Sequence, residues 1–321
     1  MESAFRAVVI GVGHLGQHHA RILSNFDNVD LIGVIDVDRD RARRISSEYG
    51  TDVIEDIGSV LGQVDGVIVA VPTQAHLLVA APLLEAGVSV LVEKPIASSS
   101  SEAEVLLRTA ESSGATLAVG HTERHNPAVV AARALISSPG FIEVHRLSTF
   151  QSRSLDIDVV FDVMIHDIDI VLSLVGSNPL SVEGVGIPVL TERVDIANAR
   201  LRFENGCIAN LTASRISREQ VRKLRVFQPH ALVTVDYAEQ ELEAWRVSRN
   251  IDGSTAVHGG PVEVATVEPL ECELRDFLQS VRNGIEPGVT GDAGRQALVV
   301  AESIIDSMED TSRLSKVSGV S

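Results

Sequence analysis

Short apolar runs alternate with longer amphipathic stretches along the first 120 residues. The runs are rich in valine, isoleucine and leucine and predict strands over residues 7–12, 29–36, 65–72, 88–93 and 115–120. The stretches between them repeat apolar residues at helical spacing and predict helices over about 14–25, 39–49, 75–86 and 101–113. Strands that are apolar on both faces and alternate with helices are typical of a doubly wound parallel sheet. We therefore expect an α/β domain over residues 1–121.

The pattern changes after residue 121. Turn residues separate several strand-like segments, which lie at 141–150, 195–203, 207–217, 223–228 and 231–237. Helical periodicity is present near 160–176, 270–283 and 292–308. These segments predict a second, α+β domain over residues 122–321, with one large, open and mainly antiparallel sheet. One face of that sheet has no predicted helix to cover it, so burial by self-association is expected.

The acidic balance of the chain excludes one class of partner. The 321 residues carry a formal net charge of −17, which opposes binding to a nucleic-acid backbone. Cys207 and Cys272 lie far apart and indicate neither a zinc site nor a disulfide framework. The sequence has no leader-like start and no run of about 18 apolar residues. We expect a cytoplasmic protein that binds no membrane.

A glycine-rich turn follows the first predicted strand. It reads "GVGHLG" and contains Gly11, Gly13, His14, Leu15 and Gly16. Glycines at such a turn permit a tight bend and the close approach of a pyrophosphate, which the amides at the start of the next helix would face. This context favours a dinucleotide-binding (Rossmann) domain.

One carboxylate is expected to select the dinucleotide. Asp36 ends the second predicted strand, twenty positions after Gly16. There it would accept hydrogen bonds from the ribose hydroxyls and repel a 2′-phosphate, which favours NAD over NADP. Arg39 leaves NADP open, because its guanidinium would pair with that phosphate if it turned inward.

Polar residues recur on one face of the helix predicted near 160–176. Asp162, His166 and Asp169 are three or four residues apart in an otherwise apolar run, whereas Asp167 is out of phase and is expected to be structural. A histidine bonded to an aspartate is common in protein cores, and imidazole with carboxylates also suits several divalent metals. No further cluster of ligands accompanies the three residues, so no metal is expected.

Lys94 is the candidate partner of this polar face. It directly follows the apolar run at 88–93 and precedes a proline. Ligands of open parallel sheets bind beyond the carboxyl ends of the strands, so Glu93 and Lys94 are expected at the binding crevice.

Three motifs together resemble the Gfo/Idh/MocA family of nicotinamide-dependent sugar and polyol oxidoreductases. They are "GVGHLG" near the start, "VEKP" at 92–95 and Asp162-x-x-x-His166, and the similarity extends over essentially the whole chain. The segment "VGHTERHNPAV" at 119–129 is similar to the UDP-N-acetylglucosamine 3-dehydrogenase branch, except that His125 stands where phenylalanine is expected.

The resemblance implies a reaction. It is the NAD-dependent oxidation of a ring hydroxyl of a nucleotide sugar to a ketone, so that a transaminase can install an amine for lipid A or other envelope glycans. Dehydrogenation of free sugars or inositols is one alternative. The other is a non-catalytic NAD-binding regulator, against which the intact Lys94, Asp162 and His166 argue.

The resemblance also implies a role for each of these three residues. His166 would remove the hydroxyl proton, because imidazole titrates near neutrality, and Asp162 would orient the ring and stabilise the imidazolium. Lys94 would hydrogen-bond the same hydroxyl and stabilise the developing alkoxide. The polar face of the helix would then look towards the nicotinamide.

Other contacts are implied by the same resemblance. Besides the glycine turn, the cofactor is expected to contact Val71, Pro72, Thr73 and His76. The two phosphates of a UDP-sugar require cationic groups, for which the candidates are Arg124, Arg153 and Arg215. His125 and Asn126 are candidate substrate contacts, and His121 is a candidate for the crevice. The resemblance favours a homodimer or homotetramer.

Overall fold

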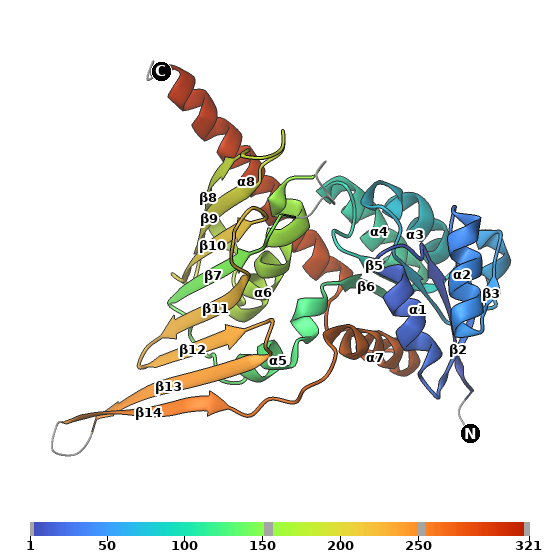
Figure 1. Ribbon diagram of the computed structural model, residues 1–321, viewed down its shortest axis with the longest axis horizontal. Helices are drawn as coiled ribbons and strands as arrows, with labels where there is room; N and C mark the ends of the chain where they lie inside the picture. The colour runs from blue at the N-terminus through green and yellow to red at the C-terminus, as the bar shows by residue number, and fades with distance from the viewer. Residues whose placement is uncertain (1–2, 151–156, 250–253, 318–321) are drawn as a thin grey trace. The chain divides into compact units, whose positions relative to one another are not determined.

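The protein, described here by a computed structural model over residues 3–150, 157–249 and 254–317, forms two compact units (Figure 1). The first contains Met1–Thr122 and Glu268–Arg295, and the second contains Glu123–Val267 and Gln296–Ser321. The expected boundary at residue 121 lies one residue from the first junction. The expectation of a continuous second domain over 122–321 differs from the structure, because Glu268–Arg295 belongs to the first unit.

One amphipathic helix explains this return of the chain. Helix α7 (Pro269–Asn283) buries Leu274, Phe277 and Leu278 in the same apolar core as Phe5. The rings of Phe5 and Phe277 meet edge to face, with centroids 6.4 Å apart. The helical periodicity near 270–283 predicts the helix, but it does not tell which core the apolar face enters.

The first unit is built on a six-stranded, parallel sheet. Its strands are β1 (Phe5–Ile10), β2 (Val29–Ile35), β3 (Asp52–Val53), β4 (Gly66–Val69), β5 (Ser89–Glu93) and β6 (Leu117–Gly120). They lie in the order β3-β2-β1-β4-β5-β6. The predicted doubly wound sheet is confirmed, with the addition of β3, which is too short to show an apolar pattern. The strand order reverses between β1 and β4, the place where ligands of such sheets bind.

Helices connect these strands. They are α1 (Gly16–Ser24), α2 (Arg39–Tyr49), α3 (His76–Glu85) and α4 (Ser100–Ser113), with 3₁₀ turns η1 (Ile57–Val60) and η2 (Thr73–Ala75). Asp38 caps the first amides of α2, and Ser99 caps those of α4. Both helices end at a glycine in the left-handed region, Gly50 and Gly114.

The second unit contains an eight-stranded sheet in the order β14-β13-β12-β11-β7-β10-β9-β8. Its strands are β7 (Phe141–Leu147), β8 (Pro179–Ile187), β9 (Ile196–Phe203), β10 (Ile208–Ser214), β11 (Val221–Gln228), β12 (Ala231–Asp236), β13 (Glu241–Arg249) and β14 (Thr255–Val262). Strands β7 and β10 are parallel, and the other pairs are antiparallel. The mainly antiparallel sheet is confirmed. Strands β8, β13 and β14 are additions, because glycine, proline or charged residues interrupt their apolar alternation.

One face of this sheet carries the core of the second unit. Helices α5 (Pro127–Arg133), α6 (Ile165–Val175) and the later part of α8 (Gly291–Val317) contribute to it, together with a π-helical turn, η4 (Val160–Met164). Figure 1 shows α5 and α6 against this face. On the opposite face, Asn198 is bonded to Thr212 and Arg200 to Asn210, while Val185 and Ile187 of β8 are exposed. A short 3₁₀ turn, η3 (Thr122–His125), precedes α5. Among the described helices, none has both the length and the apolarity needed to cross a bilayer.

Candidate active site

The glycine turn between β1 and α1 leaves space at one position. Gly11 has a φ of +86°, and a Cβ there would lie 2.7 Å from the carbonyl oxygen of Ala70. A Cβ on Gly16 would lie 1.7 Å from the carbonyl oxygen of Gly11. At Gly13 a Cβ would have its nearest neighbour 3.8 Å away, on Arg41. The first and third glycines are therefore needed for packing, whereas the second leaves room beside the backbone for the pyrophosphate of a dinucleotide.

Asp36 is fixed next to this turn. Its side chain is 4% exposed and directly follows β2. Oδ2 accepts a hydrogen bond of 2.9 Å from the N–H of Val12, and Oδ1 accepts one of 2.8 Å from the N–H of Asp38. The carboxylate thus lies where the ribose of a dinucleotide would meet it, so the residues of the turn and of β2 together fit an NAD molecule.

The arginine beside Asp36 is Arg41, not Arg39. Arg41 Nη1 lies 3.3 Å from Oδ2 of Asp36, whereas Arg39 is largely exposed and pairs with Glu55 at 3.6 Å. The sequence contains a signal for this arrangement, because Arg41 stands three residues after the cap residue Asp38 and pairs with it at 3.3 Å. Sequence reasoning missed it by weighing Arg39 alone.

The carboxyl ends of β4 and β5 carry the other expected cofactor residues. Val71 and Pro72 follow β4, and Thr73 opens η2. Glu93 ends β5, and Lys94 follows it as a partly exposed residue after five buried ones. Since β1, β4 and β5 are adjacent and parallel, these segments lie at the same edge of the sheet as the glycine turn.

His76 lies beside this edge of the sheet, inside the unit, and is 1% exposed. Its Nδ1 is 2.9 Å from the carbonyl oxygen of Pro95, whose peptide bond to Lys94 is cis, and its Nε2 is 3.0 Å from that of Val71. Burial lowers the pKa of His76. The imidazole ties the loop after β4 to the segment after β5 from inside the unit. Its expected contact with the cofactor stays a prediction.

Asp162 and His166 lie on two helical segments that follow each other directly, a π-helical turn and an α-helix. Asp162 is within the π-helical turn η4, and His166 is the second residue of α6. The N–H of Ile165 donates to the carbonyl oxygen of Val160, the i to i+5 bond that defines the turn. Such turns inside helices are frequent at functional sites. Both polar side chains are partly exposed, whereas Met164 and Ile165 between them are fully buried.

The acidic residues that follow His166 are bound to arginines of the same unit. Asp169 is fully buried. Its carboxylate accepts a hydrogen bond of 2.8 Å from Nε of Arg124 and a second one from Nη2 of the same residue. Asp167 accepts two hydrogen bonds of 2.8 Å from Arg146. Asp167 is therefore structural, as expected. Asp169 has the same kind of role, which removes it from the metal ligands considered for this helix face.

Arg146 is the centre of a buried charge network. Its Nη1 donates to Glu123 at 3.0 Å, and its guanidinium lies over the ring of Tyr237, 5.0 Å from the centroid. Burial lowers the pKa of Arg146, but the carboxylates of Asp167 and Glu123 outweigh burial and raise it, so the guanidinium stays charged. The network connects β7 to η3 and to α6.

The three candidate arginines for substrate differ in their surroundings. Arg124 uses two guanidinium nitrogens on Asp169, as described above. Arg215 is buried and donates to the Asp195 carboxylate, to the carbonyl oxygen of Ile157 and to the Thr191 hydroxyl. Arg153 lies outside the described residues. Arg215 thus supports the backbone of its own unit, while a substrate contact of any of the three stays a prediction.

The histidines and the asparagine near residue 121 also differ in their burial. Asn126 is buried, caps α5 at the N–H of Ala128 and donates to the carbonyl oxygen of Tyr237. His121 follows β6 and is fully buried, whereas His125 ends η3 and is partly exposed. Of these three expected site residues, His125 is the one whose side chain is partly exposed.

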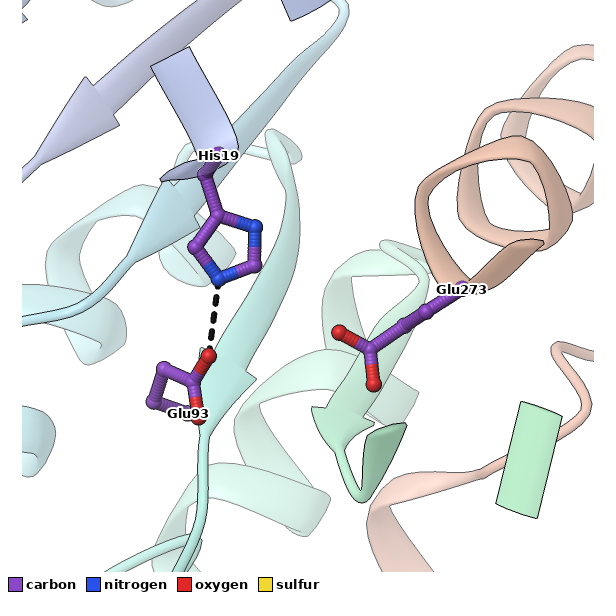
Figure 2. A group of neighbouring side chains, drawn as sticks. All are labelled: His19, Glu93 and Glu273. Atoms are coloured by element: carbon purple, nitrogen blue, oxygen red, sulfur yellow. Dashed lines mark hydrogen bonds and ion pairs between the residues drawn. The ribbon is translucent and has the colours of Figure 1, made fainter. Parts of the chain in front are cut away.

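A further group of polar side chains lies inside the first unit (Figure 2). His19 of α1, Glu93 of β5 and Glu273 of α7 are all buried, and each offers an atom within 4.8 Å of atoms of the other two. His19 Nε2 lies 2.7 Å from Glu93 Oε1. Burial raises the pKa of Glu93, but the neighbouring His19 and Lys94 outweigh burial and lower it. Sequence reasoning missed this group, because only the packing of α7 brings Glu273 to the other two.

Comparison with known proteins agrees with this geometry. Residues 5–121 match the model of the oxidoreductase family with an NAD-binding Rossmann fold, and residues 128–257 match the GFO/IDH/MocA C-terminal domain. The chain belongs to the Gfo/Idh/MocA family. Its first unit is therefore an NAD-binding Rossmann domain, which confirms the predicted family and cofactor.

Individual members of the family are similar to this chain over most of its length. UDP-N-acetylglucosamine 3-dehydrogenase of Acidithiobacillus ferrooxidans is 36% identical over 298 residues, 92% of this chain and 95% of that protein. A solved structure of UDP-N-acetylglucosamine 3-dehydrogenase from the same organism aligns with a TM-score of 0.89 and 34% identity, covering 96% and 99% of the two chains. The scyllo-inositol 2-dehydrogenase (NAD(+)) of Bacillus subtilis is 27% identical over 321 residues, 90% of each protein. The Gfo/Idh/MocA chain described here is thus an oxidoreductase acting on CH–OH groups, as predicted.

Proposed function

We propose that this oxidoreductase uses NAD to oxidise a ring hydroxyl of a UDP-activated N-acetylhexosamine to a ketone. The observation that carries the proposal is the 36% identity to UDP-N-acetylglucosamine 3-dehydrogenase over 92% of the chain. The lysine, aspartate and histidine that the reaction needs are present as Lys94, Asp162 and His166.

Each of these residues has one task in the proposed reaction. His166 accepts the hydroxyl proton at a ring nitrogen, and Asp162 orients the ring. Lys94 donates a hydrogen bond to the substrate oxygen and stabilises the negative charge that develops there. NAD, when bound, supplies the acceptor for the hydride that leaves the carbon. The buried ion pairs of Asp167 and Asp169 support the roles, because they hold the helix that carries His166.

The cofactor is proposed to lie along the edge of the parallel sheet. Its pyrophosphate would occupy the space beside Gly13, and its ribose would bond to Asp36. Arg41 lies against Asp36 and would be turned towards a 2′-phosphate only if it left that carboxylate. These contacts support NAD as the preferred dinucleotide.

The diphosphate and the sugar need further ligands. We propose Arg124 and Arg153 for the phosphates, since two nitrogens of Arg124 bind Asp169 and orient the rest of its guanidinium. Arg215 stays a candidate substrate contact, and its bond to Thr191 supports the loop there. His125, which replaces the expected phenylalanine, is proposed to contact the sugar or the nicotinamide.

Oxidation of a free sugar or inositol is the second candidate. It is favoured by the inositol dehydrogenase of Bacillus subtilis, which is 27% identical to this chain over 90% of both proteins. A regulator that binds NAD and converts nothing is a third, which the complete set of Lys94, Asp162 and His166 opposes.

One experiment separates the three. The full chain is incubated with NAD and, in parallel, with UDP-N-acetylglucosamine, UDP-N-acetylgalactosamine, UDP-glucose, glucose, myo-inositol and scyllo-inositol. We expect NADH absorbance with a UDP-N-acetylhexosamine and a product that mass spectrometry shows to have lost two hydrogen atoms. Turnover of inositols or glucose alone would establish the second candidate. Tight NAD binding without NADH from any compound would establish the third.

The same proposal includes the following reaction, the compartment and the oligomeric state of the enzyme. The keto-sugar would pass to a transaminase that installs an amine for lipid A or another envelope glycan, and the reaction would occur in the cytoplasm. The open face of the second sheet, whose outermost strand β8 exposes Val185 and Ile187, would join copies of the chain into a dimer or tetramer. Light scattering of the purified chain measures that assembly.

A further inference from the structure

We propose that His19 and Glu273 are positioning residues for Lys94 and that they act through the carboxylate of Glu93. The inference rests on the proposed function, in which Lys94 contacts the substrate hydroxyl. All four residues belong to the first unit. Three observations support the inference. They are the hydrogen bonds of the Glu93 carboxylate, the glycine that leaves space for it on β6, and the side chains of α1 and α7 that lie next to it.

Glu93 is fixed at both carboxylate oxygens. Oε1 lies 2.7 Å from Nε2 of His19, and Oε2 accepts a hydrogen bond of 3.2 Å from the N–H of Lys94. Glu93 itself is 5% exposed. A shift of its carboxylate therefore changes the orientation of the peptide group from which the Lys94 side chain starts.

The neighbouring strand makes space for this carboxylate. Gly120 of β6 pairs with Glu93 in the sheet. A Cβ on Gly120 would lie 3.0 Å from Oε2 of Glu93, closer than side chains normally approach. The side chain of Glu93 thus occupies the volume that a larger residue of β6 would need.

His19 connects Lys94 to the cofactor-binding turn. It is fully buried and is the fourth residue of α1, the helix that begins at Gly16. The start of this helix fits the phosphates of the dinucleotide, while its first turn ends at the histidine that holds Glu93. One helix thereby fixes both the place of the cofactor and the position of the lysine, as the transfer of hydride between two aligned carbon atoms requires.

Glu273 adds a second carboxylate from α7. It is 2% exposed, and an oxygen of its side chain lies within 4.8 Å of His19 and Glu93. Figure 2 shows the three side chains converging from α1, β5 and α7. Buried carboxylates are costly unless a basic group compensates them, and His19 is a basic group that lies within 4.8 Å of both. We therefore assign Glu273 the task of holding His19 against Glu93 from the side of α7.

The first test compares three variants with a matched control. His19→Leu removes the contact at similar volume, His19→Gln keeps an N–H donor, and Glu273→Gln removes one charge without changing shape. His18→Leu, at the partly exposed neighbouring histidine of the same helix, is the control. We expect His19→Leu to lower kcat by about 10- to 100-fold, the loss expected for a misplaced reacting group, while the Kd for NAD changes less than about threefold.

The other variants make the outcome decisive. His19→Gln should recover most of the lost kcat, Glu273→Gln should lower kcat several-fold with KM unchanged, and His18→Leu should match the wild type. The proposal is overturned if His19→Leu leaves kcat unchanged, or if it weakens NAD binding as much as it lowers kcat. If His19→Leu does not fold, Glu273→Gln decides, and an unchanged kcat in that variant is the contradicting result.

A second measurement needs no sugar substrate, so it separates this proposal from the proposed function. The chain has three lysines, Lys94, Lys223 and Lys316, whose acetylation by limiting acetic anhydride mass spectrometry can follow. We expect the labelling rate of Lys94 relative to Lys223 to change by at least about threefold in His19→Leu, because the reactivity of an amine depends on its charged neighbours. An unchanged ratio rejects the positioning role even if no UDP-sugar is ever converted.

Metal analysis tests whether the three side chains bind a metal ion instead of each other. The three side chains offer one nitrogen and two oxygens, a ligand set that divalent cations also accept. We expect the purified holoenzyme to contain no stoichiometric metal and its activity to be unaffected by EDTA. One metal ion per wild-type chain that is lost in His19→Leu would overturn the hydrogen-bonded arrangement and replace it with a metal site.

Discussion

Asp169 holds Arg124 through hydrogen bonds from two guanidinium nitrogens, and both side chains are almost completely buried. The pair fastens η3 to α6, the helix that contains His166. Removing one partner leaves the other charge buried and uncompensated. We expect Asp169→Ala to lower the free energy of unfolding by about 3–5 kcal/mol, measured by denaturant titration.

The matched comparison for this pair is an exposed one. Arg108 and Glu104 form an ion pair at 2.9 Å on the surface of α4, and Arg108→Ala should cost less than about 1 kcal/mol. Equal losses in the two variants would contradict the argument from burial.

The proposed chemistry depends on Lys94 and His166. Lys94→Ala and His166→Ala should each lower turnover by about 10²- to 10⁴-fold, because each removes a proton-transfer or charge-stabilising group from the reaction. The Kd for NAD, measured by calorimetry, should change little in either variant. Parallel losses of NAD affinity and turnover in both would show that the assigned roles are wrong.

The choice of dinucleotide depends on Asp36 and on the arginine beside it. Asp36→Ser removes the charge that repels a 2′-phosphate and releases Arg41 to pair with it. We expect the ratio of kcat/KM for NADP to that for NAD to rise by at least about tenfold, or about 1.4 kcal/mol of discrimination. Adding Arg41→Ala to that variant should reverse the gain, whereas adding Arg39→Ala should not. The opposite pattern would restore Arg39 as the residue that binds the phosphate.

The glycine turn makes opposite predictions for two of its glycines. At Gly16 a Cβ would overlap the carbonyl oxygen of Gly11 at 1.7 Å, so Gly16→Ala should prevent stable folding of the first unit. At Gly13 the nearest atom would be 3.8 Å away, so Gly13→Ala should keep the melting temperature while weakening NAD binding. Circular dichroism and NAD titration measure the two properties. A folded Gly16→Ala protein, or a Gly13→Ala protein with wild-type affinity, would count against the geometry of the turn.

Asp195 gives the protein a stability that depends on pH. Burial raises the pKa of Asp195, but the N–H groups of Thr191, Leu190 and Val189 and the guanidinium of Arg215 outweigh burial and hold it well below its usual value. Because the folded-state pKa is lower than the unfolded value of about 3.9, this stabilisation is complete above that value. It is lost as the pH falls towards the folded-state pKa.

The pH profile of a variant checks this sign. The difference in unfolding free energy between the wild type and Asp195→Asn should be largest near neutrality and should shrink as the pH falls below about 4. A difference that stays constant down to the acid limit would mean that the carboxylate is not ionised in the folded protein.

Elements with local signals were predictable from the sequence. Helix α2 occupies the expected 39–49, because Asp38 caps its start and Gly50 ends it. The inner strands of the parallel sheet were equally clear, since each is a short apolar run. Lys94, Asp162 and His166 are also recognisable from neighbours in the chain, and their roles stay predictions.

Features that depend on distant packing could not be read in this way. Asp169 shares a helix face with His166, yet its partner Arg124 is 45 residues earlier in the chain. Glu273 reaches His19 only because α7 buries Phe277 beside Phe5. Strand β14 contains two glycines and a proline and is defined by its partner β13, so its own sequence carries little strand signal.

Helix α7 has a consequence for the order in which this protein is made. The ribosome delivers all six strands of the NAD-binding unit long before it delivers Leu274, Phe277 and Leu278, which complete that unit's core. During the interval the whole antiparallel sheet is synthesised, and the apolar surface around Phe5 lacks its cover. The core of the nascent nucleotide-binding unit is therefore completed only after the segment that follows the antiparallel sheet has been synthesised.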